Sequence, residues 1–201
     1  MSDNTESQEA IKDTMSRLRA IMVNIDNMFG DAERLLKERG FNALHTGFQC
    51  EQSKAQAVLF VPQYATVFYA KQEDEESEDA LTICVCTYFA DRLGNAIDPV
   101  MACLVFEPRD RKVRYTSWWA RVSLFGGPEQ EHDESLPAGV TVRVPRPASR
   151  ANYWFKKSYH FTLPLTTINE VESLERLAIA PLCALYARLA RSSEGGNLSS
   201  T

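Results

Sequence analysis

The order of hydrophobic patterns along the chain is the strongest constraint on its fold. Between residues 41 and 165, short runs rich in Val, Phe and Tyr follow one another with no helical spacing between them. Strands in such succession pair antiparallel, because a parallel pair needs a long, usually helical, crossover. The sequence therefore predicts an α+β fold with an antiparallel sheet of about six or seven strands over 41–165. Strands are expected at 41–50, 57–70, 80–89, 100–107, 113–125, 139–144 and 152–163, with the most apolar runs, 80–89 and 100–107, at the centre.

A long helical segment is predicted before the sheet, over residues 8–39. Its apolar residues recur every seven positions, and a second seam lies three positions further on. A helix of this length is roughly 45 Å long, more than one small sheet can cover. An apolar surface left uncovered in this way usually marks an interface. The candidate interface residues are Ile11, Leu18, Ile21, Ile25 and Met28.

Two glycines bear on where this first helix ends. Gly40 follows the last apolar residues of the pattern and is expected to terminate the helix. Gly30 interrupts the pattern and is followed by Asp31, a good helix N-cap, so the alternative is two helices bent at Gly30.

A kinked C-terminal helix is predicted over residues 167–191. Thr167 and Glu170 have the spacing of a capping box at its start, and Pro181 is expected to kink it. Both helices should cover one face of the sheet. Residues 1–7 are predicted to be flexible and the Ser/Gly-rich stretch 192–201 to be disordered, which leaves a single domain over 8–191.

Motifs for catalysis, phosphate binding or metal binding do not stand out. The three histidines lack metal-ligand spacing, and Cys84 and Cys86 are predicted to share a core-facing strand surface. We therefore expect no catalytic residues, no metal and no cofactor. Asp98 and Glu107 flank an apolar run as the acids of a metal-dependent hydrolase or nuclease would. Nine residues of strand would hold them nearly 30 Å apart, about 3.3 Å for each residue, too far to share one ion.

Charge is unevenly distributed along the chain, whose net charge is −5. Six acids lie within residues 73–79, whereas five cations and no acid lie between Ser135 and Asn169. Such complementary segments can pair within the chain or with a neighbour. The basic segment 143–161 also interleaves cations with aromatic residues, as single-stranded nucleic-acid binding requires. Its candidate contacts are Arg143, Arg146, Arg150, Trp154, Lys156 and Lys157. Strand alternation predicts Tyr153, Phe155, Tyr159 and Phe161 on one face.

The preferred functional interpretation is a non-enzymatic cytoplasmic protein that acts through association, with itself or with a protein partner. The N-terminal helix and the complementary charged loops would carry this association. A nucleic-acid-binding accessory protein is the second interpretation, and a metal-dependent hydrolase or nuclease is the third. No membrane association is expected, because the apolar segment 177–187 is about half the length of a membrane span. The polar N-terminus does not resemble a secretory signal.

Overall fold

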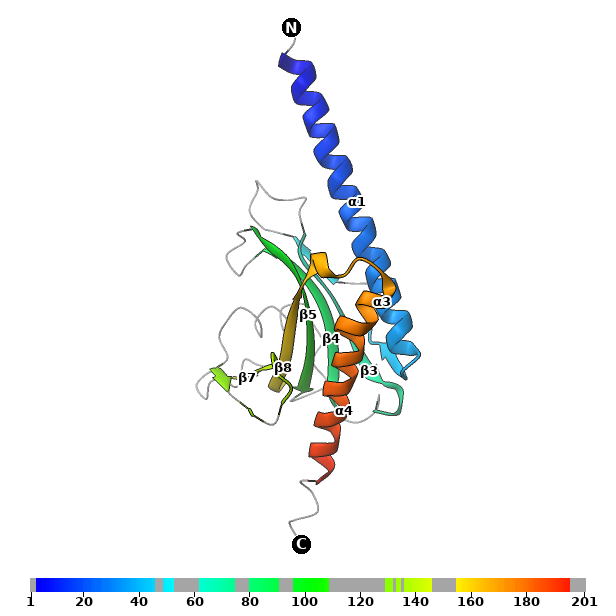
Figure 1. Cartoon of the computed structure of the whole chain (residues 1–201), viewed down its shortest axis with the longest axis vertical. Coiled ribbons are helices and arrows are strands. Elements are labelled where there is room, and N and C mark those ends of the chain that lie inside the picture. The colour runs from blue at the N-terminus through cyan, green and yellow to red at the C-terminus, as the bar shows by residue number, and fades with distance from the viewer. Residues whose placement is uncertain are drawn as a thin grey trace.

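The computed structural model describes residues 3–45, 49–52, 62–74, 80–90, 96–108, 129–131, 133–134, 136–145 and 155–195. It has the predicted α+β architecture, with an antiparallel sheet between an N-terminal helix and a C-terminal helical segment (Figure 1). The strands are β1 (Phe41–Ala43), β2 (Gln49–Gln52), β3 (Pro62–Lys71), β4 (Thr82–Ala90), β5 (Ala96–Pro108), β6 (Glu129–Glu131), β7 (Thr141–Val144) and β8 (Phe155–Pro164).

The spatial order of the strands is β1-β3-β4-β5-β8-β7-β6, and every described pair is antiparallel. The two most apolar runs form β4 and β5 at the centre of the sheet, as predicted. The expected strand at 41–50 is instead divided into β1 and β2, which pair with successive parts of β3. The strand predicted at 113–125 lies outside the described residues.

The N-terminal helix, α1 (Asp3–Lys37), is a single element that begins before the predicted residue 8. It runs through Gly30, so the alternative of two helices is wrong. The helix ends at Lys37, two residues before the predicted end, and the turn that follows closes at the predicted glycine: Gly40 has a φ of 81° and donates its N–H to the carbonyl of Lys37 at 2.9 Å. Glycine adopts this left-handed conformation without the steric cost that a Cβ would bring.

The C-terminal segment consists of α3 (Val171–Leu174), a π-helical turn η5 (Glu175–Ile179) and α4 (Ala180–Gly195). The wide turn lies directly before Pro181, which has no N–H for an ordinary helical hydrogen bond. Ala180 donates to the carbonyl of Glu175, five residues back. The disturbance predicted at Pro181 is therefore a π turn.

The predicted capping box at Thr167 and Glu170 is wrong by one turn. Thr167 belongs to a 3₁₀ turn, η4 (Leu165–Thr167), and its hydroxyl donates to the carbonyl of Pro164 at 2.7 Å. Because this turn comes first, Glu170 is the N-cap and Ser173 completes the box. The Ser173 Oγ accepts the Glu170 N–H at 3.2 Å.

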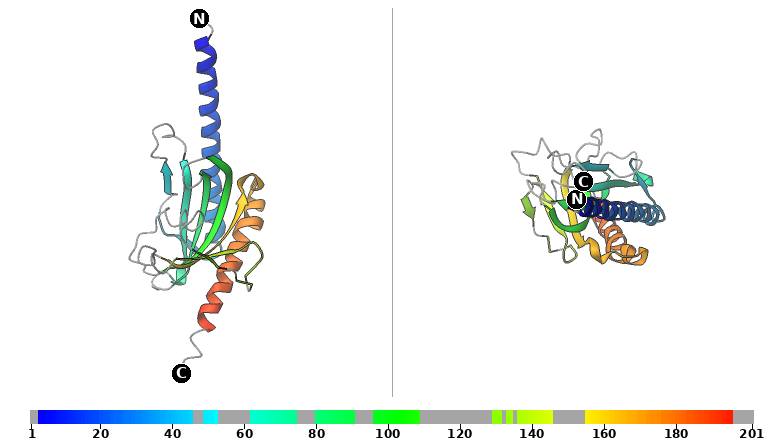
Figure 2. Two further views of the ribbon diagram at one scale, coloured as in Figure 1. Left: turned by 90° about the vertical axis from the view of Figure 1, so that its left-hand side faces the viewer. Right: turned by 90° about the horizontal axis from the view of Figure 1, so that it is seen from above.

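Two apolar clusters lie on opposite faces of the sheet. Both helices cover the first face, where α1 and α4 pack over alternate residues of β3, β4, β5 and β8 (Figures 1 and 2). Phe41 meets Tyr186 of α4 there, with ring centroids 4.9 Å apart. The second face contains Phe68, Leu104 and Phe106, together with both cysteines predicted to face the core. These two cysteines are fully buried.

A bulge in β8 overturns the predicted alternation of its aromatic residues. The pairing between β5 and β8 shifts register between Glu107 and Pro108, which adds one residue to β8 at Lys156. Tyr159 and Phe161 face the helices, but Phe155 lies on the other face, 5.3 Å from Phe106 between ring centroids. Tyr153 lies outside the described residues.

Candidate association surface

The first half of α1 projects beyond the rest of the domain. Figures 1 and 2 show the helix continuing past the end of the sheet toward the N-terminus. Every side chain from Ser7 to Arg17 is exposed, Leu18 is the first to be half-buried, and Ile25 is the first to be buried. The helix therefore extends well beyond the part that packs on the sheet.

One face of α1 runs without interruption from the buried half into the exposed half. The core residues Ile25, Phe29, Ala32 and Leu36 follow one another at three- or four-residue spacing. The same spacing continues toward the N-terminus through five residues that we call the α1 stripe: Ile11, Met15, Leu18, Ile21 and Met22. Within it Ile11, Met15 and Ile21 are 64%, 52% and 49% exposed.

The predicted interface residues thus divide into two groups. Ile11, Leu18 and Ile21 belong to the stripe. Ile25 is 3% exposed and is part of the core, and Met28 packs half-buried against that core. Heptad spacing identified the apolar face of the helix. Which residues of that face are exposed and which are core depends on where the sheet ends.

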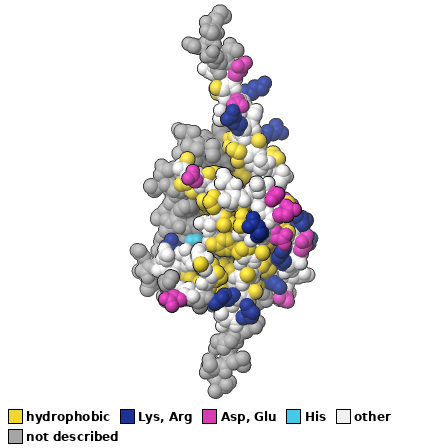
Figure 3. All heavy atoms as spheres, in the orientation of Figure 1, with side chains coloured by type: hydrophobic (Ala, Val, Ile, Leu, Met, Phe, Trp, Pro, Cys, Tyr) yellow, Lys and Arg dark blue, Asp and Glu magenta, His cyan; other side chains and the backbone are white. Residues whose placement is uncertain are grey.

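An apolar groove of about 310 Å³ lies at the base of the stripe. Its walls include Ile21, Ile25, Met28, Phe89, Leu165 and Ile168. Figure 3 shows apolar side chains extending from the projecting helix onto this face of the molecule. The stripe and the groove therefore form one continuous apolar surface.

Charge along the exposed half of α1 changes sign. Residues 3–13 contain four acids and one lysine, whereas residues 14–25 contain Arg17 and Arg19 and no acid. Acids at the N-terminal end are favourable beside the positive end of the helix dipole. Asp13 and Arg17 form an exposed ion pair at 2.9 Å, a contact of small energetic value in water.

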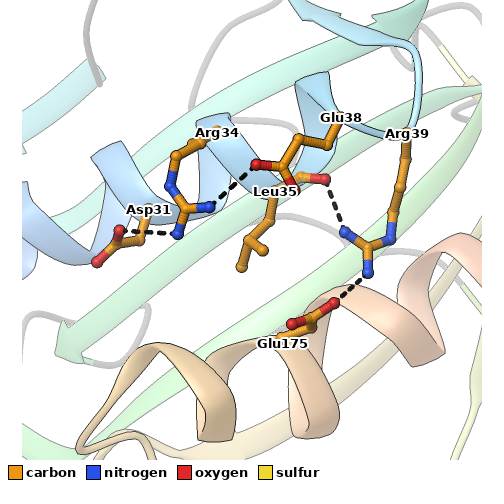
Figure 4. A network of polar contacts seen from close by, with 6 residues as sticks. All are labelled: Asp31, Arg34, Leu35, Glu38, Arg39 and Glu175. Atoms are coloured by element: carbon orange, nitrogen blue, oxygen red, sulfur yellow. Dashed lines mark hydrogen bonds and ion pairs between the residues drawn. The ribbon is translucent and has the colours of Figure 1, made fainter.

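A polar network fixes the other end of α1 on the C-terminal segment (Figure 4). Arg34 donates to Glu38 at 3.0 Å and also contacts Asp31, and these contacts raise the pKa of Arg34. Arg39 donates to the carbonyl of Leu35 at 2.8 Å and pairs with the carboxylate of Glu175 on η5. These contacts, with the core beneath, set the direction in which the free half of α1 points.

The basic segment does not form one face among the residues that are described. Arg143 lies opposite Ser158 on the face away from the helices, whereas Lys157 lies on the helix side and pairs with Glu131 at 3.3 Å. Lys156 is exposed at the bulge. Arg146, Arg150 and Trp154 lie outside the described residues, as do residues 75–79 of the acidic segment.

His160 is a buried polar residue that the sequence did not single out. It is 6% exposed, and its Nδ1, like the Nε of Arg143, has no hydrogen-bond partner among the described residues. Burial, and then the nearby Arg143 charge, lower the pKa of His160 to about 4. The imidazole is therefore neutral at pH 7. The one sequence signal for its position is the alternation along the strand, which places His160 on the face of the sheet away from the helices.

Of the remaining candidates for chemistry, Asp98 is exposed on β5, Glu107 is occupied, and the cysteines of the central strands are buried. Glu107 accepts a hydrogen bond from the Tyr159 hydroxyl at 2.6 Å, and burial raises the pKa of that tyrosine. Burial also raises the pKa of Cys84 and Cys103, which keeps these thiols protonated and weakly nucleophilic. Among the described residues, no group of three or more His, Cys, Asp or Glu side chains is arranged to hold a metal ion.

None of the described helices carries an apolar stretch long enough to cross a membrane. Comparisons with protein-family models, with curated proteins and with solved structures found no match.

Proposed function

We propose that this chain is a non-enzymatic interaction or assembly protein that binds a protein partner through the α1 stripe. The observation that supports this is the continuity of one helix face. From Ile25 onward that face is core and Met22 packs half-buried against it, whereas Ile11, Met15 and Ile21 on the same face are exposed to solvent. Contiguous apolar surface of this kind is uncommon on monomeric soluble proteins and usually marks an interaction site.

The stripe is large enough to support a specific complex. Fully burying one exposed aliphatic side chain contributes about 1.5–3 kcal/mol. The stripe offers three exposed residues, Ile11, Met15 and Ile21, and the half-buried Leu18 and Met22 add a smaller share. Association costs about 4–15 kcal/mol in lost motion, and a micromolar complex needs about 8 kcal/mol net. A partner that contributes a comparable apolar surface meets this requirement.

The spacing of the stripe indicates the shape of the partner. Its members Ile11, Met15, Leu18 and Met22 are separated by four, three and four residues, which is the spacing that packs against another amphipathic helix. A nucleic-acid partner has weaker support, because Arg143 and Lys157 lie on opposite faces of the sheet.

The proposal is tested by the native size of the full chain in an extract of its own cells. The wild type should elute well above 22.7 kDa, and Leu18→Asp should elute at the size of the single chain. Val23→Asp is the matched control, since Val23 is 51% exposed on the same helix but outside the stripe. Equal elution of the wild type and Leu18→Asp would contradict the proposal.

A further inference from the structure

We infer that the partner of the α1 stripe is a second copy of this chain, paired with it antiparallel. The inference rests on the proposed function and adds the identity of the partner and its orientation. A twofold pair uses the same surface on both copies, so the stripe must be complementary to itself.

The exposed stretch of α1 satisfies this requirement when the two helices cross near Ser16. Ile11 of one copy then lies opposite Ile21 of the other, and Leu18 lies opposite Thr14. Each of these contacts joins a residue of the first heptad seam (Ile11, Leu18) to a residue three positions further on in the repeat (Thr14, Ile21), as in antiparallel coiled coils. The two Met15 side chains meet beside the axis. This overlap covers Ile11, Met15 and Ile21 of both copies and places each Ile11 at the rim of the other copy's groove, which Ile21 lines.

The direction of pairing follows from the continuity of the helix face. Immediately after the stripe, the same face of α1 is covered by its own sheet from Ile25 onward. In a parallel pair both sheets would have to occupy the space between the two helices at the same end. In an antiparallel pair the two domains lie at opposite ends, and each meets only the N-terminal end of the other helix. That end carries exposed polar residues on this face, Ser7 and Gln8.

Charge also favours the antiparallel pair. A parallel pair aligns each acid of residues 3–13 with the same acid of its partner and each arginine with the same arginine. In the antiparallel crossing only the two Arg17 side chains come close to each other, and Asp13 of each copy lies near both of them. The ion pair that Asp13 and Arg17 already form within one helix, at 2.9 Å, then becomes part of a four-residue network.

The first test is the mass of the purified full-length chain in solution by analytical ultracentrifugation. At ~100 μM, well above a micromolar dissociation constant, the wild type should sediment at twice 22.7 kDa. Leu18→Asp should sediment as the single chain and Val23→Asp as the pair. Circular dichroism should show that both variants are folded, because neither residue belongs to the core. A monomeric wild type at this concentration would overturn the inference.

The second test is disulfide cross-linking, which reports direction. Antiparallel pairing puts two Ile11 positions about 15 Å apart along the axis, too far for a disulfide, but puts Ile11 opposite Ile21. Co-expressed Ile11→Cys and Ile21→Cys chains should form a disulfide with each other. Either variant expressed alone should cross-link no more than the wild type, which is the control for the five native cysteines. Cross-linking of Ile11→Cys to itself would show a parallel pair and overturn the inference.

The outcomes separate this inference from the proposed function. A purified chain that stays monomeric, but still shows a stripe-dependent increase in size in the extract, would overturn the second copy as partner and leave the association function in place. Loss of both effects would overturn both.

Discussion

His160 illustrates how one side chain connects burial to stability. Its pKa is about 4 in the folded chain, against an ordinary value of 6.5, so between these values the folded state binds fewer protons than the unfolded state. The free energy of unfolding should therefore fall as the pH decreases from 6.5 to 4, and the contribution of His160 should be fully present above 6.5.

The corresponding prediction uses His160→Gln. The wild type should lose about 3 kcal/mol more than this variant across the window, because 1.36 kcal/mol accompanies each unit of pKa. Urea unfolding of both proteins from pH 4 to 7 measures the difference, and the carboxylates that also titrate cancel between them. Parallel curves would show that His160 has an ordinary pKa in the folded chain.

The residue scale also shows what the sequence could not predict. Alternation correctly placed Cys84 and Cys86 in the core, because β4 is regular along its pairing with β3. It failed for Phe155, because a bulge is a property of two strands in register and leaves no mark on one strand read alone.

Elements were predictable where local chemistry decides, and less so at their junctions. Gly40 ended α1 as expected, since an αL position selects glycine. The capping box was misplaced because Thr167 and Glu170 fit the motif equally well in isolation. Only the 3₁₀ turn after β8 decides where the helix begins.

Two glycines in different elements should respond oppositely to the same substitution. Gly30→Ala should stabilise the chain by about 0.5–1 kcal/mol, because Gly30 is inside a helix and a Cβ there meets no atom within 4 Å. Gly139→Ala should destabilise it by about 1–2 kcal/mol, because a φ of 85° is strained for alanine even in open space. Urea unfolding measures both. A destabilising Gly30→Ala would mean that the helix is not continuous there.

At the scale of the whole molecule, the sheet determines which part of α1 is core. The heptad pattern predicted the apolar face and its excess length, but no feature of the helix itself marks Ile25 as the first buried residue. That boundary is a tertiary property: it depends on where β4, β5 and the turn after β8 approach the helix, since Phe89, Pro99 and Leu165 line the groove beside Ile25.

Two isoleucines at the same heptad position test this division. Ile25→Ala should cost about 2–4 kcal/mol of unfolding free energy because it opens a cavity in the core, whereas Ile11→Ala should change it by less than about 0.5 kcal/mol. Both are measured by urea unfolding at low protein concentration, so that association does not contribute. Similar losses for the two variants would place Ile11 in the folded core.

The central claim, that the α1 stripe is an association surface, is tested most directly by contact at a single position. A photo-activatable cross-linking residue at Leu18 of the full chain, irradiated in an extract of its own cells, should give one discrete adduct with a second polypeptide. The same residue at Val23, outside the stripe, should give little or none. No adduct at Leu18, or equal adducts at both positions, would contradict the claim.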